Sequence, residues 1–315
     1  MKPLITIGVT ARNEAACIRR TLESLLHSVA QAVREGLADY QVVAILDECT
    51  DDTERVVREF PNVHVAHSSG GLIEAQRTIS TKRPFVIFCD ADILVGANVI
   101  TALSRAMLSD PKLQVTYPRK RPLRPMRRTL LAAALYCYNR VEGFQTSRRY
   151  FNGKLFAIRD WQAPTIEQLQ PRLAGLTDDR FYNYHSGLRV DDIWLSRDIL
   201  LRHGAQAIRE VEAAEISYQP PETLTGMYRM YLRMRREIER LNVLFPESVP
   251  AHQARQHDRE AERRAPVTDR LLLRVFNLAL VWCKIRYRMD RFYYQNLSSE
   301  TMDAWKPVRE TKIAP

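Results

Sequence analysis

Two carboxylates separated by one residue, Asp90 and Asp92, follow an apolar run from Phe85 to Cys89. A short turn places such a pair close enough to share one divalent cation, and Mg²⁺ or Mn²⁺ prefers oxygen ligands of this kind together with phosphates. An Asp-x-Asp sequence in a loop is also typical of an Asx turn or of a solvated acid pair. The pair therefore indicates metal-assisted phosphate chemistry only if its position and its neighbours agree.

Two other acidic segments are candidates for the same site. The turn from Asp47 to Thr53 can offer hydrogen-bond acceptors to a base or a ribose, and Asp191 and Asp192 precede a helical pattern. Both segments have an ordinary structural explanation, because acids and threonines at the start of a helix cap it and interact well with its dipole. The two interpretations are compatible.

The elements that would position these acids alternate, over residues 1–90, between short β-branched runs and helical stretches. This pattern predicts βαβ units and a mainly parallel sheet. Open α/β sheets bind ligands at the carboxyl edge of their strands, so both acidic turns in this part of the chain are expected at that edge. We expect strands at 4–9, 41–46, 63–66 and 85–89, and helices at 13–33, at 50–60 and after Gly70 and Gly71.

The rest of the chain is expected to add helices at 98–108, 127–140, 190–203 and 224–244, and strands at 114–117, 151–158 and 215–218, with 151–158 closing the sheet. Residues 246–269 are polar and charged, which predicts a flexible loop or linker. The segment 271–294 mixes apolar, aromatic and basic residues, as an amphipathic helix does when it docks on a domain or on a membrane surface. The predicted organisation is a domain over 1–245, a linker over 246–269 and a helical C-terminal extension over 270–315.

Composition narrows the class of protein. Of the 315 residues 45% are hydrophobic, which is enough for a core and excludes a disordered chain. The net charge of +10 favours an anionic partner, namely a nucleotide, phospholipid headgroups or nucleic acid. Five widely spaced cysteines without a CxxC pair indicate neither a disulfide framework nor a zinc cluster. No apolar run suits a signal peptide or a membrane span, so we expect a cytoplasmic protein whose membrane contact, if any, is peripheral.

Two more segments complete a pattern: Val9–Glu14 at the end of the first strand, and Gly71–Arg77 at the start of a helix. With them the sequence resembles the family-2 inverting glycosyltransferases, which have a P-x-Y-N-E-like turn, a D-x-[SC]-x-D-x-T turn, a G-x-x-x-A-R-[NR]-like helix and D-x-D. Segments 152–159 and 190–195 are similar to the family's acceptor-facing glycine segment and to its E-D-x-x-L motif. The resemblance covers residues 3–245. It implies an α/β fold of the GT-A type, with a mixed, mostly parallel sheet flanked by helices.

The resemblance also implies roles for the matching residues. Asp92, with Asp90, would bind Mn²⁺ or Mg²⁺ and the donor diphosphate. Asp192 would act as catalytic base beside Asp191, although which of these two acids is the base stays open. The base would deprotonate an acceptor hydroxyl as it attacks the anomeric carbon, and direct displacement inverts that centre. The donor would contact Thr10, Arg12, Glu14, Asp47 and Arg77, and the acceptor would contact Asn152, Gly153 and Trp194.

The sequence departs from the family pattern in residues that would recognise the nucleobase of the donor and in the motif of processive synthesis. Thr10 stands where the family has a proline, Arg12 where it has an aromatic residue and Leu46 where it has an acid. These departures make the nucleobase of the donor the least determined part of the predicted site. UDP-sugars are the first expectation. The Q-x-x-R-W motif of processive synthases is missing, which predicts a non-processive enzyme. The helix there carries arginines that either reach the diphosphate or form a solvated face with nearby glutamates: Arg233, Arg235 and Arg236.

The expected partners are a nucleotide-diphosphate sugar and a glycan or lipid-linked acceptor. The basic stretch 119–128 would either hold an anionic membrane or a pyrophosphate-linked lipid, or form a solvated loop. Two other functions compete with this one. A nucleotidyltransferase needs a glycine-rich loop, which residues 10–14 lack. A catalytically inactive GT-A-like basic module for membrane or nucleic acid would not need Asp90, Asp92 and Asp192. Carboxylates also repel a phosphate backbone, so nucleic acid is not an expected partner.

Overall fold

The computed structural model describes residues 2–79, 84–141, 144, 150–177, 179–189, 191–251, 259–303 and 311–312. Its centre is one mixed sheet with the strand order β3-β2-β1-β4-β7-β6-β8-β5. The strands are β1 (Leu4–Ala11), β2 (Asp39–Asp47), β3 (Val63–Ser68), β4 (Val86–Asp90), β5 (Ile93–Val95), β6 (Val115–Pro122), β7 (Leu155–Ile158) and β8 (Ile208–Tyr218).

The first half of the sheet is built from the predicted βαβ units. Strands β1 to β4 are parallel, and β1 lies between β2 and β4. Most of their side chains are buried on both faces, as the continuous apolar runs predict. The connecting helices are α1 (Ile18–Glu35), α2 (Thr53–Arg58) and α3 (Leu72–Arg77). All four predicted strands and all three predicted helices of this half are present.

The second half of the sheet differs from the prediction in the added strand β5, in the greater length of β6 and β8, and in the place of β7. Strand β7 does not close the sheet but lies inside it, antiparallel to β4 on one side and to β6 on the other. This position brings the segment before β7 next to the carboxyl end of β4, where Asp90 donates its amide to the carbonyl of Lys154 at 2.7 Å. The other helices of this half are α4 (Val99–Ser109), α5 (Leu130–Arg140), α6 (Ile166–Leu173) and α7 (Asp191–His203).

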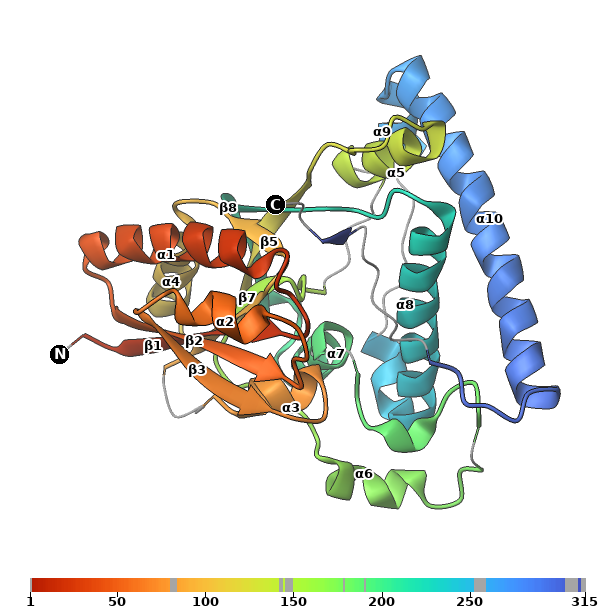
Figure 1. The fold of residues 1–315 in the computed structure, drawn as a ribbon, viewed down its shortest axis with the longest axis horizontal. Coiled ribbons are helices and arrows are strands. Elements are labelled where there is room, and N and C mark those ends of the chain that lie inside the picture. The colour runs from red at the N-terminus through yellow and green to blue at the C-terminus, as the bar shows by residue number, and fades with distance from the viewer. Residues whose placement is uncertain are drawn as a thin grey trace.

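Two long helices lie on the side of the molecule away from β1 to β3 (Figure 1). They are α8 (Leu224–Leu244), whose bounds match the prediction, and α10 (Val267–Asn296). A 3₁₀ helix (Pro246–Ala251) and α9 (Arg259–Arg264) lie between them in the chain. Buried side chains of β4, α7, α8 and α10 belong to one continuous hydrophobic cluster, so α10 shares the core of the fold.

The predicted helix over 13–33 begins later, at Ile18. Asn13 has a φ of 56°, in the left-handed region, which a helix cannot include. The backbone amides of Glu14 and Ala15 donate to side chains of the turn before α2 rather than to helical carbonyls. Tertiary hydrogen bonds therefore replace the predicted first turn.

Residues 119–122 of the basic stretch 119–128 form a strand rather than a loop. Residues up to Pro122 belong to β6, which pairs with β8. Arg119 and Arg121 form ion pairs with Glu210 and Glu215 across these two strands, at 3.5 and 2.8 Å. Their charge is thus matched within the sheet, and such exposed pairs contribute little to stability.

The packing around β1 leads to a testable prediction at Gly8. A Cβ atom there would lie 2.1 Å from Cδ1 of Ile79, so Gly8→Ala forces that side chain to move. We expect the substitution to lower the free energy of unfolding by about 1–3 kcal/mol in chemical denaturation. Ile79→Val removes the clashing methyl group, and combined with Gly8→Ala it should recover about 1 kcal/mol of that loss. Strictly additive effects of the two substitutions would contradict this account of the packing.

Candidate active site

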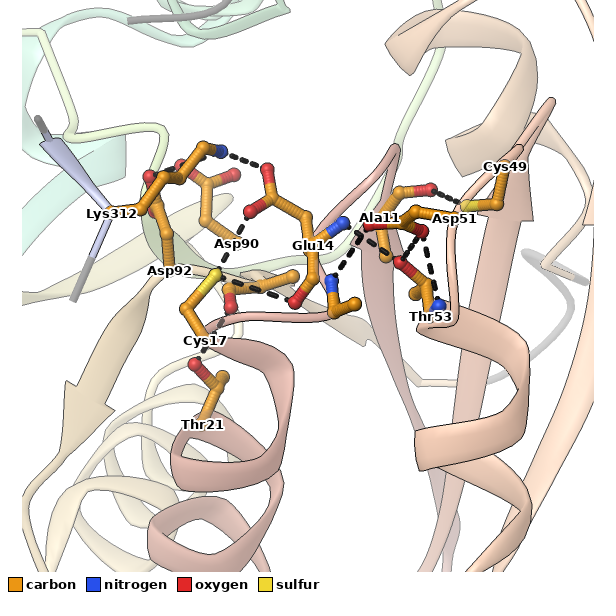
Figure 2. A network of polar contacts seen from close by, with 12 residues as sticks. Ala11, Glu14, Cys17, Thr21, Cys49, Asp51, Thr53, Asp90, Asp92 and Lys312 are labelled. Carbon is orange, nitrogen blue, oxygen red and sulfur yellow. Dashed lines mark hydrogen bonds and ion pairs between the residues drawn. The ribbon is translucent and has the colours of Figure 1, made fainter. Parts of the chain in front are cut away.

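The site lies at the carboxyl edge of β1, β2 and β4, where the loop between β1 and α1 is held by side chains from two sides (Figure 2). The Glu14 amide donates to the hydroxyl of Thr53 at 2.8 Å, and the Ala15 amide donates to Asp51 at 3.1 Å. On the other side, the Thr21 hydroxyl lies 2.9 Å from the carbonyl oxygen of Ala91. The acidic turn after β2 thus holds the loop, and the first turn of α1, which follows the loop, contacts the turn after β4.

Asp47 is buried at the end of β2. Its Oδ1 accepts from the Gly71 amide at 3.1 Å and from the Ser68 hydroxyl at 3.3 Å, while Oδ2 lies 3.4 Å from Nη1 of Arg12. Arg12 also pairs with Glu48 at 2.9 Å, and about half of its side chain is exposed. The guanidinium of Arg12 is therefore an accessible planar group at the position where the family has an aromatic ring.

Asp90 and Asp92 converge on one ammonium group. Nζ of Lys154 lies 3.4 Å from Oδ2 of Asp90 and 3.1 Å from Oδ1 of Asp92. Thr10 is the register partner of Asp90 across β1 and β4, which places it beside this pair. The structure therefore brings together the predicted donor residues Thr10, Arg12, Glu14, Asp47, Asp90 and Asp92.

A second ammonium group reaches the same acids from the C-terminal end of the chain. Lys312 forms an ion pair with Glu14, and its Nζ lies 3.8 Å from Oδ2 of Asp92 (Figure 2). Neither Lys154 nor Lys312 was predicted as a site residue. The sequence carries no signal for either contact, since Lys312 is separated from Glu14 by 298 positions.

The two carboxylates respond differently to these neighbours. Burial raises the pKa of Asp90 to about 7, although Lys154 acts in the opposite direction. Burial also acts to raise the pKa of Asp92, but the charges of Lys154 and Lys312 hold this pKa below its usual value. The pKa of Asp92 is therefore lowered while that of Asp90 is raised, so Asp90 is the member of the pair that takes up a proton more readily.

These residues fit a divalent cation that is bound together with a diphosphate. Mg²⁺ is commonly held by one or two carboxylates, with phosphate oxygens and waters as the remaining ligands. Asp90 and Asp92 already direct oxygens at one cationic group. Within the described residues no group of three or more His, Cys, Asp or Glu side chains could hold a metal alone. The donor set is thus suited to a metal that arrives with phosphate.

Asp191 and Asp192 begin α7 and have different surroundings. Asp191 is buried, and it accepts from Nε2 of Gln76 at 2.5 Å and from the Asp192 amide at 2.8 Å. Gln76 in turn accepts from Nε1 of Trp161 at 3.0 Å. Burial, followed by the charge of Asp192, raises the pKa of Asp191 to about 7. The role of Gln76 in fixing this acid was not predicted.

Asp192 is only half-buried and faces the segment before β7. Its Oδ2 accepts from the Gly153 amide at 3.3 Å, and a Cβ atom on Gly153 would lie 3.0 Å from Cβ of Asp192. Asn152 accepts from the Lys154 amide at 3.2 Å. Residues 152–154 therefore connect Asp192 on one side to Asp90 and Asp92 on the other.

Two predicted site residues lie elsewhere. Trp194 packs on Phe245 with ring centroids 4.0 Å apart, and Arg77 lies over the ring of Trp161. Both line a cavity of about 700 Å³ between α3, α6 and α7. Two residues along a helix correspond to a rotation of about 200°, so Trp194 points away from the side that carries Asp192. The structure does not bring Trp194 or Arg77 to the acids.

The arginines of α8 have other partners. Arg235 pairs with Glu239 at 2.7 Å, as the solvated-face alternative predicts. Arg236 is buried and donates to the backbone carbonyls of Tyr182 and Met302, at 2.9 and 3.3 Å. Burial lowers the pKa of Arg233, with Arg229 as a further cause. Arg235 thus lies on a half-exposed face of α8, and Arg236 holds the backbone at Tyr182 and Met302.

Comparison with known proteins assigns the chain to a family. The family model described as "Glycosyl transferase family 2" matches residues 6–192, more than half of the chain. This match and the mixed, mostly parallel sheet confirm the predicted GT-A-like α/β fold. No curated protein matches the chain.

Similar solved structures include two of glucosyl-3-phosphoglycerate synthase from Mycobacterium tuberculosis. One is a complex with Mn²⁺, uridine diphosphate and glucosyl-3-phosphoglycerate; it is 21% identical, covers 77% of this chain and 80% of that chain, and has a TM-score of 0.46. The other is a complex with Mn²⁺, uridine diphosphate and phosphoglyceric acid, with 21% identity, coverage of 77% and 78%, and a TM-score of 0.48.

Removing the Lys154 ammonium group tests the electrostatics of the acid pair. Lys154→Met leaves Asp90 and Asp92 facing each other with less compensation, so we expect a loss of about 2 kcal/mol in the free energy of unfolding. The freed acids should bind Mn²⁺ more tightly, so Mn²⁺ should raise the melting temperature of this variant more than that of the wild type. Lys154→Arg keeps the charge and is the matched control. An equal effect of Mn²⁺ on wild type and Lys154→Met would contradict the proposed geometry.

Proposed function

The chain belongs to glycosyl transferase family 2, and we propose that it is a metal-dependent inverting enzyme that transfers a hexosyl group from a UDP-sugar to an acceptor hydroxyl. We propose a single, non-processive transfer to a glycan or a lipid-linked glycan. The observation that carries the proposal is the connection through residues 152–154. Lys154 contacts the pair Asp90 and Asp92, and the adjacent Gly153 contacts Asp192.

The donor half of the proposed site is the edge formed by the turns after β1, β2 and β4. Asp90 and Asp92 would hold Mn²⁺ or Mg²⁺, which would offset the charge that grows on the departing diphosphate. Lys154 and Lys312 place further positive charge at the same point. Arg12 and Asp47 would contact the nucleoside, because a guanidinium stacks on a base and a carboxylate accepts from its N–H groups.

The acceptor half depends on Asp192. A general base must be within reach of the proton that it removes, and Asp192 is the more accessible of the two acids of α7. Asp191 is fixed by Gln76 and the backbone, so we assign it a positioning role for the start of α7. In the proposed reaction the acceptor oxygen attacks the anomeric carbon while Asp192 takes its proton. The bond to the diphosphate breaks on the opposite face, and the configuration inverts.

We also propose that residues 1–245 form the transferase domain, that 246–269 link it to the rest, and that 270–315 form a C-terminal extension. The family match lies within the first of these segments. The 3₁₀ helix Pro246–Ala251 and α9 lie within the second, and residues 252–258 fall outside the described part of the chain.

Paired substitutions separate donor binding from catalysis. Asp92→Asn should abolish the Mn²⁺-dependent part of UDP binding in calorimetry, because it removes the carboxylate whose pKa is lowered. Asp192→Asn should leave UDP binding unchanged and lower sugar transfer by about 10²–10⁴-fold, the usual contribution of a general base. Transfer can be followed as UDP release from UDP-glucose and UDP-galactose, with the anomeric configuration of the product read by NMR.

Asp39→Asn is the matched control, since this acid is exposed at the amino end of β2, at the edge of the sheet opposite to the site. Its binding and transfer should equal those of the wild type. Tight binding of GDP in place of UDP would change the assigned donor. Binding of neither nucleotide would favour the alternative of an inactive module, and retention of the substrate's configuration would contradict the inverting mechanism.

A further inference from the structure

Helix α10 has one face packed against the protein. Phe276, Cys283 and Asp290 are seven residues apart, so they fall on one line along the helix, and all three are buried. Phe276 stacks on Tyr138 of α5 with ring centroids 3.7 Å apart, and Asp290 accepts from the Tyr228 hydroxyl of α8 at 2.5 Å. This face accounts for the attachment of α10 to the fold.

The opposite face of α10 is apolar and exposed. Leu278, Ile285 and Phe292 are also seven residues apart, and their side chains are 72%, 52% and 60% exposed. The neighbouring Trp282 and Met289 are exposed as well. Figure 1 shows that α10 runs along the edge of the molecule, with α8 and α5 on its inner side. A contiguous apolar surface of this kind marks an interaction site, whereas single exposed apolar residues do not.

The charges on α10 indicate the kind of partner that the exposed face would bind. The helix carries six basic residues and two acidic residues. Both acids are turned to the protein: Asp290 is buried, and Asp269 pairs with Arg140 at 2.9 Å. The exposed residues Arg274, Lys284 and Arg288 flank the apolar line. The surface is thus apolar along its centre, basic along its side, and without a carboxylate.

The start of α5 and the residues before it carry further exposed apolar and basic side chains. Met126 and Leu130 are both more than 60% exposed, and Arg127 and Arg128 lie between them in the chain. α5 packs along the N-terminal half of α10, through the Tyr138–Phe276 stack. The part of the basic stretch that is not paired within the sheet precedes α5, and its Met126 and Arg127 amides donate to Glu222 at 2.8 and 2.7 Å.

We propose that the outward face of α10 binds the surface of an anionic phospholipid bilayer. An interfacial helix places apolar side chains at the boundary between headgroups and acyl chains, while its flanking Lys and Arg side chains contact the headgroups. No helix of the described residues is long and apolar enough to cross a membrane, so α10 lies in the plane of the interface. The inference does not depend on the sugar transfer proposed above.

Vesicle flotation of the full-length protein tests this proposal. The protein should float with vesicles of phosphatidylcholine and phosphatidylserine at low salt, and with vesicles of phosphatidylcholine alone it should bind at least about tenfold less. Leu278→Gln, Ile285→Gln and Phe292→Gln together should abolish binding, because they remove the apolar line. Gln favours helices, so the far-UV circular dichroism should be unchanged.

Matched variants make the result specific. Val33→Gln, Leu201→Gln and Val243→Gln together change three similarly exposed apolar residues on α1, α7 and α8. This control should bind anionic vesicles like the wild type. Arg274→Gln, Lys284→Gln and Arg288→Gln together should weaken binding about tenfold or more, and should reduce its sensitivity to salt, because charge attraction to the headgroups is screened by ions.

The emission of Trp282 gives a direct readout of the helix surface. It should shift to shorter wavelength when anionic vesicles are added, and Trp282→Phe should remove that shift. Three results would overturn the proposal: no flotation with anionic vesicles, equal binding to neutral vesicles, or equal loss of binding in the control triple variant. A dimer in sedimentation equilibrium that the α10 triple variant abolishes would also overturn it, since a second copy of the chain would then cover this face.

Discussion

Lys154 lies between Asp90 and Asp92, and the arrangement of the site depends on this interaction. Carboxylates gathered at one edge of a sheet repel one another and lose hydration, so each must be compensated by a cation or a donor. Lys154 and Lys312 compensate the pair after β4, backbone amides compensate Asp47 and Asp51, and Gln76 compensates Asp191. Side chains and amides of the chain itself thus compensate the acids, and positive charge lies where a diphosphate would bind.

The internal position of β7 joins the two halves of the proposed reaction centre. Because β7 lies between β4 and β6, the residues that precede it pass between the donor edge and the start of α7. Gly153 has no side chain, which leaves room for the carboxylate of Asp192. The adjacent Lys154 reaches the acid pair. A backbone segment of three residues thus sets the separation between the proposed metal ligands and the proposed base.

Much of this could be predicted from the sequence, because local patterns determine it. The apolar runs predicted β1 to β4, and the acids that follow β2 and β4 were expected at one edge, where they lie. Contacts between distant residues could not be predicted in this way. Gln76 and Asp191 are 115 positions apart, and nothing in the sequence indicates that they meet. Trp194 was assigned through the resemblance of residues 190–195 to the E-D-x-x-L motif, but it lies on the other side of α7 from Asp192 and lines the cavity beside Arg77.

Anomalous diffraction from crystals grown with Mn²⁺ and UDP would test the central claim most directly. The account predicts a manganese peak at coordination distance, about 2.2 Å, from the carboxylate of Asp92, with diphosphate oxygens among the other ligands and the ammonium of Lys312 moved off that carboxylate. A manganese peak elsewhere in the molecule, or bound UDP with the contacts of Lys154 and Lys312 to Asp92 unchanged and no manganese beside them, would contradict it.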